Sequence, residues 1–285
     1  MRPKGFATRT ARGYETGRVD STDQQLLLDA KRGDAAAVDA LLAKYERQIF
    51  RFGLRMCGNE DDARDVLQET LLAAFKGVHE FRGDAQLSTW LYQVARSFCV
   101  KQHRRHVGEP AVTEPLDSPQ AERVRDPAPE PDRATQAMQI GRLLQEALLE
   151  LPEGQREVVV LRDVEGLSAE EAARVLGLDV PALKSRLHRG RAALRALLSG
   201  KLGEAPEQAP GCAALANELA AYAAEDIDQA TCARIEQHLS ECPRCTAACN
   251  DLKHTVSLCA ALPQGKVPER VRKAVRSALT ELSTA

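Results

Sequence analysis

The stretch 166–198 constrains the fold of this chain most strongly, because it combines two helix signals around a short turn. Ser168 and Glu171 stand at the spacing of a capping box, in which each side chain bonds the other residue's backbone N–H. Gly177 is expected to end that first helix in the left-handed conformation. Pro181 is suited to begin a second helix, since a first helical residue needs no N–H. The pattern predicts a helix-turn-helix.

The second helix of this pair is predicted to be amphipathic and basic. Leucines recur on one side at helical spacing, and the range 181–201 holds six Lys or Arg residues with no Asp or Glu. The whole chain has a formal net charge of only −2. This local excess of positive charge therefore indicates a face that binds a polyanion rather than one that is only solvated. We therefore expect the helix to contact DNA through Lys184, Ser185, Arg186, His188, Arg189 and Arg191, with 184–189 in the major groove and the later arginines on phosphates.

The range 23–107 is predicted to form further helices with two outward faces of opposite charge. The helix that starts near Asn59 turns carboxylates outward, and such a face would repel DNA and suit a protein partner. A later helix, which Ser88 is expected to cap, carries Trp90 toward a core and ends in a basic run at 101–106. That basic end is a second candidate nucleic-acid surface, where an aromatic ring could stack on an unpaired base.

The remaining ranges differ in composition from these helices. Residues 1–22 are polar without periodicity, and 108–138 are rich in Pro, Glu and Asp, so we expect a disordered tail and a flexible linker. We therefore predict an all-α chain with helical lobes at 23–107 and 139–200 and a small helical domain at 205–285. No apolar run reaches the about 18 residues of a membrane span, so we expect a cytoplasmic protein without a membrane partner.

Six of the eight cysteines lie in the range 205–285, and their spacing is typical of metal ligands. Thiols stay reduced in the cytoplasm, so disulfides are not expected. The run HLSECPRC at 238–245 places one imidazole and two thiolates at spacings that let them reach one ion. Cys57 and Cys99 are interpreted as small buried side chains. Further candidate ligands are Cys232, Cys249 and Cys259.

A thiolate-rich site of this kind favours a closed structural or sensory centre over an enzyme active site. No Ser/His/Asp set and no glycine-rich phosphate loop occurs elsewhere in the sequence, so we expect no catalytic activity. A stand-alone helix-turn-helix regulator with a zinc-binding tail is an alternative, but it leaves the acidic helix and the second basic helix without a role.

The order of these parts resembles the extracytoplasmic-function (ECF) sigma factors of bacterial RNA polymerase. The resemblance is carried by DDARDVLQET at 61–70, by FRG at 81–83, by STWLY at 88–92 and by the helix-turn-helix. It implies that 23–107 is sigma region 2 and that 139–200 is sigma region 4. The implied function is transcription initiation, with binding to the β′ clamp and β flap of core RNA polymerase, recognition of promoter DNA and promoter melting.

The same resemblance assigns roles to individual residues, with the basic helix of the helix-turn-helix reading the upstream promoter element. It implies that the polymerase clamp is contacted by Asp62, Asp65, Gln68 and Glu69. It implies that the downstream element is melted and held, with one base flipped out, by Gly83, Asp84, Ala85, Gln86, Leu87, Trp90, Arg96, Lys101, Arg104 and Arg105.

The cysteine-rich range is similar to the zinc-binding anti-sigma domains, and that similarity implies zinc ligation by Cys212, His238, Cys242 and Cys245. On the same chain as two sigma regions, it resembles the metal-dependent ECF sigma factors of the CorE type. This implies control of activity by metal binding to the tail, without a separate anti-sigma factor. Zinc or cadmium is favoured over copper because no C-x-C pair is present. A sigma factor with a purely structural zinc tail is the alternative.

Overall fold

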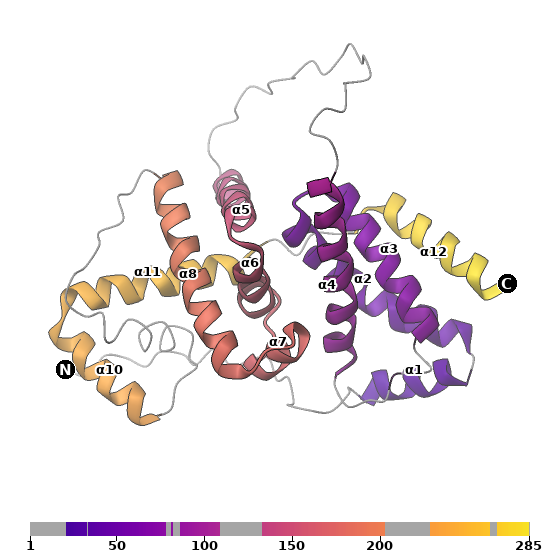
Figure 1. The fold of residues 1–285 in the computed structure, drawn as a ribbon, viewed down its shortest axis with the longest axis horizontal. Helices are drawn as coiled ribbons and strands as arrows, with labels where there is room; N and C mark the ends of the chain where they lie inside the picture. The colour runs from indigo at the N-terminus through magenta and orange to yellow at the C-terminus, as the bar shows by residue number, and fades with distance from the viewer. Residues whose placement is uncertain are drawn as a thin grey trace, which may run out of the picture.

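Every regular element in the structure is a helix. The computed structural model describes residues 21–32, 34–77, 81, 86–108, 133–202, 229–262 and 267–284, and no strand occurs among them. The predicted all-α fold is therefore confirmed. Most of the predicted tail 1–22 and of the predicted linker lies outside these residues, as do Gly83, Asp84, Ala85 and Cys212. Figure 1 shows two lobes side by side, with C-terminal helices lying against both.

The first lobe is a bundle of four helices. They are α1 (Ser21–Lys31), α2 (Ala35–Cys57), α3 (Glu60–Gly77) and α4 (Leu87–Gly108). Asp34 begins α2 by accepting hydrogen bonds from the backbone N–H groups of the first turn, and Gly58 ends it at φ 86°. Asn59 caps α3, as predicted, by accepting the backbone N–H of Asp62 at 2.8 Å. These caps fix where the long helices turn back to enclose a core around Phe52 and Leu67.

The start of α4 differs from the prediction. Ser88 was expected to cap this helix, but α4 begins one residue earlier, at Leu87. The Leu87 side chain is only 2% exposed, so burial of this leucine in the core accompanies the earlier start. The Ser88 hydroxyl instead lies 3.4 Å from the side-chain oxygen of Gln86.

The second lobe contains the predicted helix-turn-helix. Its elements are α5 (Arg133–Glu150), α6 (Glu153–Val159), the π-helix η1 (Val160–Val164), α7 (Ala169–Leu176) and α8 (Val180–Leu202). Ser168 and Glu171 form the expected capping box before α7, and Gly177 adopts φ 64° after it. The helix α5 begins inside the range predicted as linker. An apolar core that includes Leu144, Leu161 and Leu183 joins these helices.

The helices α6 and α8 lie close together at Gly190. A Cβ atom there would lie 2.9 Å from Val159 Cγ2 and 3.1 Å from the carbonyl oxygen of Gln155. We expect Gly190→Val to lower the free energy of unfolding by about 1–3 kcal/mol through overpacking, as measured by urea denaturation. Gly200→Val in the same helix is the matched control, because a Cβ at Gly200 meets nothing within 4 Å. Equal effects of the two substitutions would contradict the close approach.

Three C-terminal helices follow the second lobe. They are α10 (Gln229–Glu241), α11 (Pro243–Ala260) and α12 (Glu269–Thr284). The helix α11 crosses α8, η1 and α5 of the second lobe, whereas α12 lies along α3 of the first (Figure 1). Between the start of α11 and α12 the chain enters the apolar core of the lobes through Cys259, Leu262, Val267 and Val271, whereas α10 packs on α11 in a separate small cluster around Ile235.

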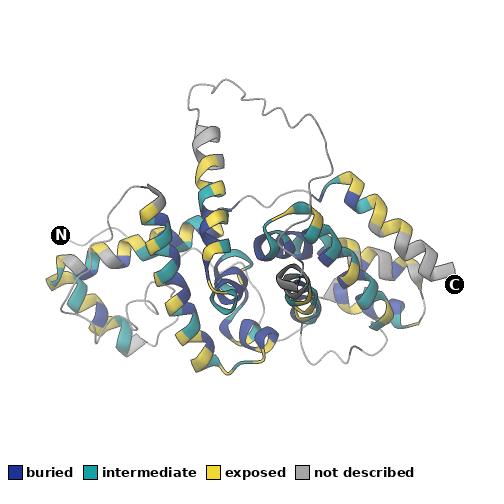
Figure 2. Ribbon diagram, turned by 45° about the horizontal axis from the view of Figure 1, so that its top comes forward, coloured by how far each residue is buried: buried dark blue, intermediate teal, exposed yellow. Residues whose placement is uncertain are grey.

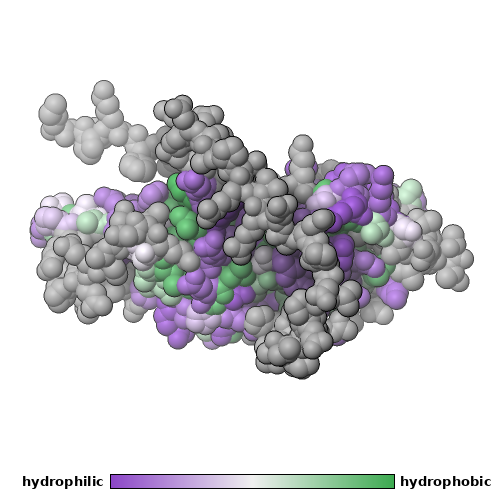
Figure 3. Space-filling view, turned by 90° about the horizontal axis from the view of Figure 1, so that it is seen from above, coloured by the Kyte–Doolittle hydropathy of each residue, from purple (hydrophilic) through white to green (hydrophobic). Residues whose placement is uncertain are grey.

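The distribution of buried and exposed residues agrees with this packing of the helices. The helices turn buried positions toward one another, and the outer side of α12 carries exposed residues (Figure 2). The face seen in Figure 3 is largely hydrophilic where the structure describes it, with smaller hydrophobic areas between. None of the described helices combines the length and apolar composition needed to cross a bilayer.

Candidate nucleic-acid interface and metal centre

The N-terminal half of α8 presents a basic surface to solvent. Asp179 caps this helix by accepting the backbone N–H of Ala182 at 2.7 Å, which fixes where the helix begins. Lys184, Ser185 and Arg189 are exposed, and Arg186 and His188 are half-buried. Burial and the nearby Arg191 and Arg189 lower the pKa of His188, so its imidazole is neutral at pH 7. The exposed part of the predicted DNA-reading set therefore lies along one side of the helix.

Arg191 lies in the interior, unlike most of that set. Its side chain is 4% exposed and forms a two-point ion pair with Asp163 of η1, at 2.9 and 2.5 Å. Such bidentate pairs have a fixed geometry, so Arg191 joins α8 to η1. In this structure the guanidinium is occupied by a buried carboxylate and does not face the surface where phosphates would bind.

One predicted basic residue of α4, Arg96, faces the second lobe. Arg96 Nε lies 2.6 Å from a carboxylate oxygen of Glu157, whose side chain is only 2% exposed. Burial raises the pKa of Glu157, and the ion pair with Arg96 opposes that rise. Trp90 packs its ring 5.4 Å from that of Phe81, and Leu87 is buried, so both serve the core here. The side chains of Arg104 and Arg105 lie outside the described residues.

The predicted polymerase-binding residues lie along a groove between α3 and α4. The groove has a volume of about 250 Å³, and its lining includes Asp65, Gln68 and Glu69 from α3 and Lys101 from α4. Asp62 stands at one end, where Gln102 Nε2 donates to it at 3.3 Å. The structure thus brings all four predicted residues to the side of α3 that faces α4.

A buried polar network between the lobes was not predicted. Glu165, whose side chain is fully buried, accepts hydrogen bonds from Arg51 Nε at 2.8 Å and from the Tyr92 hydroxyl at 2.7 Å. Nearby, Arg156 donates to the backbone oxygen of Met56 at 2.7 Å. The sequence held one signal of this network, because Glu157 directly precedes the apolar run 158–161, where a surface carboxylate is not expected.

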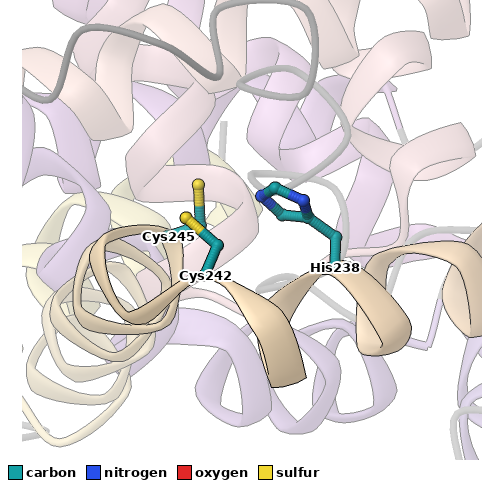
Figure 4. A group of neighbouring side chains, drawn as sticks. All are labelled: His238, Cys242 and Cys245. Atoms are coloured by element: carbon teal, nitrogen blue, oxygen red, sulfur yellow. The ribbon is translucent and has the colours of Figure 1, made fainter.

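Three predicted metal ligands converge between α10 and α11. One possible ligand atom from each of His238, Cys242 and Cys245 lies within 4.8 Å of the other two (Figure 4). The Nε2 atom of His238 is buried and has no hydrogen-bond partner, and Cys245 is 4% exposed. A buried nitrogen without a partner beside two sulfurs suits a soft, tetrahedral metal ion, which supplies the missing interaction. The donor set therefore fits zinc.

The other candidate thiols lie outside this group of three. Cys232 is half-buried and donates to Glu236, and Cys249 packs in the small apolar cluster beneath Cys245. Cys259 is 14 residues beyond Cys245 on the same helix, a separation of about 21 Å at 1.5 Å per residue. Burial raises the pKa of the Cys259 thiol far above its usual range, in the core between the lobes.

Three family models match the chain, one for each of these regions. They are "Sigma-70 region 2" over 41–108, "Sigma-70, region 4" over 141–194 and "Putative zinc-finger" over 212–246. The ECF RNA polymerase sigma factor SigM of Mycobacterium tuberculosis is 36% identical over 182 residues, which are 64% of this chain and 87% of SigM. The chain belongs to the ECF sigma factors.

A second relative gives the same family. The RNA polymerase sigma-H factor of Pseudomonas aeruginosa is 32% identical over 187 residues, 64% of this ECF sigma factor and 97% of the relative. The two sigma family models match sigma region 2 in the first lobe and sigma region 4 in the second. The solved structure of CnrH in complex with the cytosolic domain of CnrY is 27% identical, with a TM-score of 0.48, over 63% of this chain and 98% of the matched chain.

Proposed function

We propose that this ECF sigma factor directs RNA polymerase to promoters and that its own metal-binding tail, α10 to α12, restrains it. The restraint is a closed arrangement in which the tail holds regions 2 and 4 together. One observation carries the proposal: α11 packs on region 4 and α12 on region 2, within a single apolar core. A tail that contacts both lobes stabilises the arrangement in which they touch.

The contacts of α12 lie next to the surface proposed to bind polymerase. Val271 is fully buried on this helix, Arg272 pairs with Glu46 of α2 at 2.8 Å, and Arg270 pairs with Glu60 at the start of α3. The ion pair between Arg270 and Glu60 is exposed and contributes little to the stability of the contact between α12 and region 2. Burial of Val271 is expected to contribute most of that stability. The α12 helix thus lies beside the acidic groove on α3.

The closed arrangement also pairs arginines of both sigma regions with carboxylates. Arg96 of region 2 is held by Glu157 of region 4, and Arg195 of α8 pairs with Asp251 of the tail at 3.0 Å. Promoter binding needs such cations for phosphates, which these carboxylates exclude. The closed chain is therefore expected to bind promoter DNA more weakly than an opened one.

Metal binding is proposed to set the strength of this restraint. His238 and Cys242 come from the end of α10 and the turn after it, and Cys245 comes from the first turn of α11. With Cys212 as the proposed fourth ligand, one zinc ion would fix the angle between these helices and so position α11 on region 4. Control of this kind agrees with the resemblance to CorE-type factors and needs no separate anti-sigma factor.

Binding to purified bacterial core RNA polymerase tests the proposal. We expect Val271→Asp in the full chain to raise the affinity at least 10-fold, because a buried carboxylate expels α12 from region 2. Ala274→Asp adds the same charge at an exposed position of the same helix and should leave the affinity unchanged. Equal affinities of the native chain and Val271→Asp would contradict restraint by the tail.

A second arm separates metal control from a structural zinc. Removal of zinc with a chelator is expected to raise the polymerase affinity of the native chain and to have little further effect on Val271→Asp. If the chelator does not change the polymerase affinity of the native chain, metal control is contradicted and a purely structural ion is favoured. The change in polymerase affinity caused by Val271→Asp would then still test whether the tail restrains the sigma regions.

A further inference from the structure

Two thiols of sigma region 2 lie together where that region meets region 4. Cys57 is the last residue of α2, and Cys99 lies within α4. They line the same small cavity, and each thiol is the largest influence on the pKa of the other. Cys99 is 4% exposed, whereas Cys57 is half-buried. Neither belongs to the metal centre or to the DNA-facing side of α8.

A small cavity adjoins both sulfurs. Its volume is about 30 Å³, and it is lined by Cys57, Cys99 and Gln102 from region 2 and by Glu153 and Arg156 from region 4, among others. A cavity needs roughly 10–15 Å³ to admit one water molecule, so this one has room for a ligand about the size of hydrogen peroxide. The lining is polar enough to hold such a ligand by hydrogen bonds.

Arg156 brings a positive charge to the wall of this cavity. Its side chain is 7% exposed, and its two terminal nitrogens donate to backbone oxygens, among them that of Met56 beside Cys57. These bonds hold the guanidinium in place next to Cys57.

The two thiols differ in their ionisation. The neighbouring Cys99 thiol is the main influence that lowers the pKa of Cys57; burial and the Asp62 carboxylate oppose it, and Arg156 adds a smaller lowering. The pKa of Cys99 is raised by the neighbouring Cys57 and by its burial. Cys57 is therefore the better nucleophile and Cys99 the thiol that keeps its proton, which is the division of labour in a peroxide-reactive pair.

We propose that Cys57 and Cys99 form a peroxide-reactive dithiol that closes to a disulfide between α2 and α4. The Cys57 thiolate attacks one oxygen of the hydroperoxide and breaks the O–O bond, which gives a sulfenic acid and a hydroxide. Cys99 gives its proton to that hydroxide and attacks the sulfenic sulfur, which expels a second hydroxide that takes a proton from solvent. Two electrons pass from the two sulfurs to the peroxide, which leaves as two molecules of water.

Oxidation of this pair would also affect the contact between the lobes. A disulfide has no negative charge, so it removes the partner that a Cys57 thiolate offers to Arg156. It also ties the end of α2 to α4, next to the backbone oxygen of Met56 to which Arg156 donates. Oxidation is therefore expected to loosen region 4 on region 2 independently of the metal centre.

Peptide mapping of the zinc-loaded full chain tests the proposal. After hydrogen peroxide treatment and blocking with iodoacetamide, tryptic peptide 56–64 is expected to be linked to peptide 97–101, and unlinked peptide 56–64 should fall severalfold. Cys57→Ser should abolish the link. Cys99→Ser should leave a sulfenic acid on Cys57 that dimedone captures. Cys232→Ser, which removes a thiol far from the pair, should leave the link unchanged and serves as the matched control.

Two results would overturn the inference. One is full alkylation of Cys57 and Cys99 after a peroxide dose that oxidises the tail thiols. The other is a disulfide that joins Cys57 to a tail cysteine in place of Cys99. Because both are observed by peptide mass, a loss of zinc from the tail during treatment does not obscure the answer.

Discussion

Replacement of Glu165 by alanine is expected to separate sigma regions 2 and 4 in the full chain. The Glu165 side chain is fully buried and accepts from Arg51 and Tyr92 across the boundary, and the Arg51 side chain is only 9% exposed. Removal of one member of a buried ion pair costs about 3–5 kcal/mol, because the remaining charge loses its partner in a desolvated place. That loss corresponds to an increase on the order of 10²- to 10³-fold in the open population.

Hydrogen exchange measured by mass spectrometry checks this expectation. Backbone amides of α4 and η1 that face the boundary should exchange faster in Glu165→Ala, and small-angle scattering should show a larger radius of gyration. Glu170→Ala is the matched control, because Glu170 is an exposed carboxylate of the neighbouring helix α7. Unchanged exchange and an unchanged radius in Glu165→Ala would show that the polar network does not hold the lobes.

Replacement of Cys245 by serine is expected to weaken zinc binding enough for the ion to be lost on dialysis against a chelator that leaves the native chain loaded. The Cys245 residue is buried, and its sulfur lies within 4.8 Å of a possible ligand atom of both His238 and Cys242. Structural zinc contributes about 10–16 kcal/mol in small domains, or about 3 kcal/mol for each of four ligands, so loss of one ligand should weaken affinity about 10²-fold or more. Because folding and zinc binding are coupled, the helix content of the tail should fall with it.

Zinc bound to the purified chain, measured by mass spectrometry of the metal, decides this prediction. Cys232→Ser is the control, since that thiol contacts Glu236 and lies outside the cluster. Normal zinc content in Cys245→Ser would contradict the assignment. Loss of zinc in Cys232→Ser would instead make Cys232 a ligand. The same measurement on Cys249→Ser tests whether a thiol packed beneath the cluster contributes.

The sequence predicted those parts of the fold that depend on neighbours in the chain. Ser168, Glu171 and Gly177 mark the helix-turn-helix because capping acts within one turn of helix. The same holds for the clustered ligands from His238 to Cys245, which lie seven residues apart at most. Local spacing determines both features, so periodicity and motif reading are sufficient for them.

Contacts between distant parts of the chain could not be predicted in this way. Arg191 was expected to contact DNA because it lies off the leucine side of its helix. Its guanidinium instead donates hydrogen bonds to the buried carboxylate of Asp163, 28 residues earlier. Glu165 and Arg51 are 114 residues apart, and no periodic pattern relates them. Cys259 resembles the other tail thiols in sequence, but the length of α11 carries it into the core between the lobes.

If α11 and α12 hold the two sigma regions closed, as proposed, every molecule would be made with its own inhibitor in a fixed ratio of one to one. A tethered inhibitor acts at an effective concentration that does not depend on how much protein the cell makes. Overproduction would then not overcome the restraint, as it can when an inhibitor is encoded separately. The number of active molecules would follow the chemical signal alone, and each molecule would respond to that signal independently of the others.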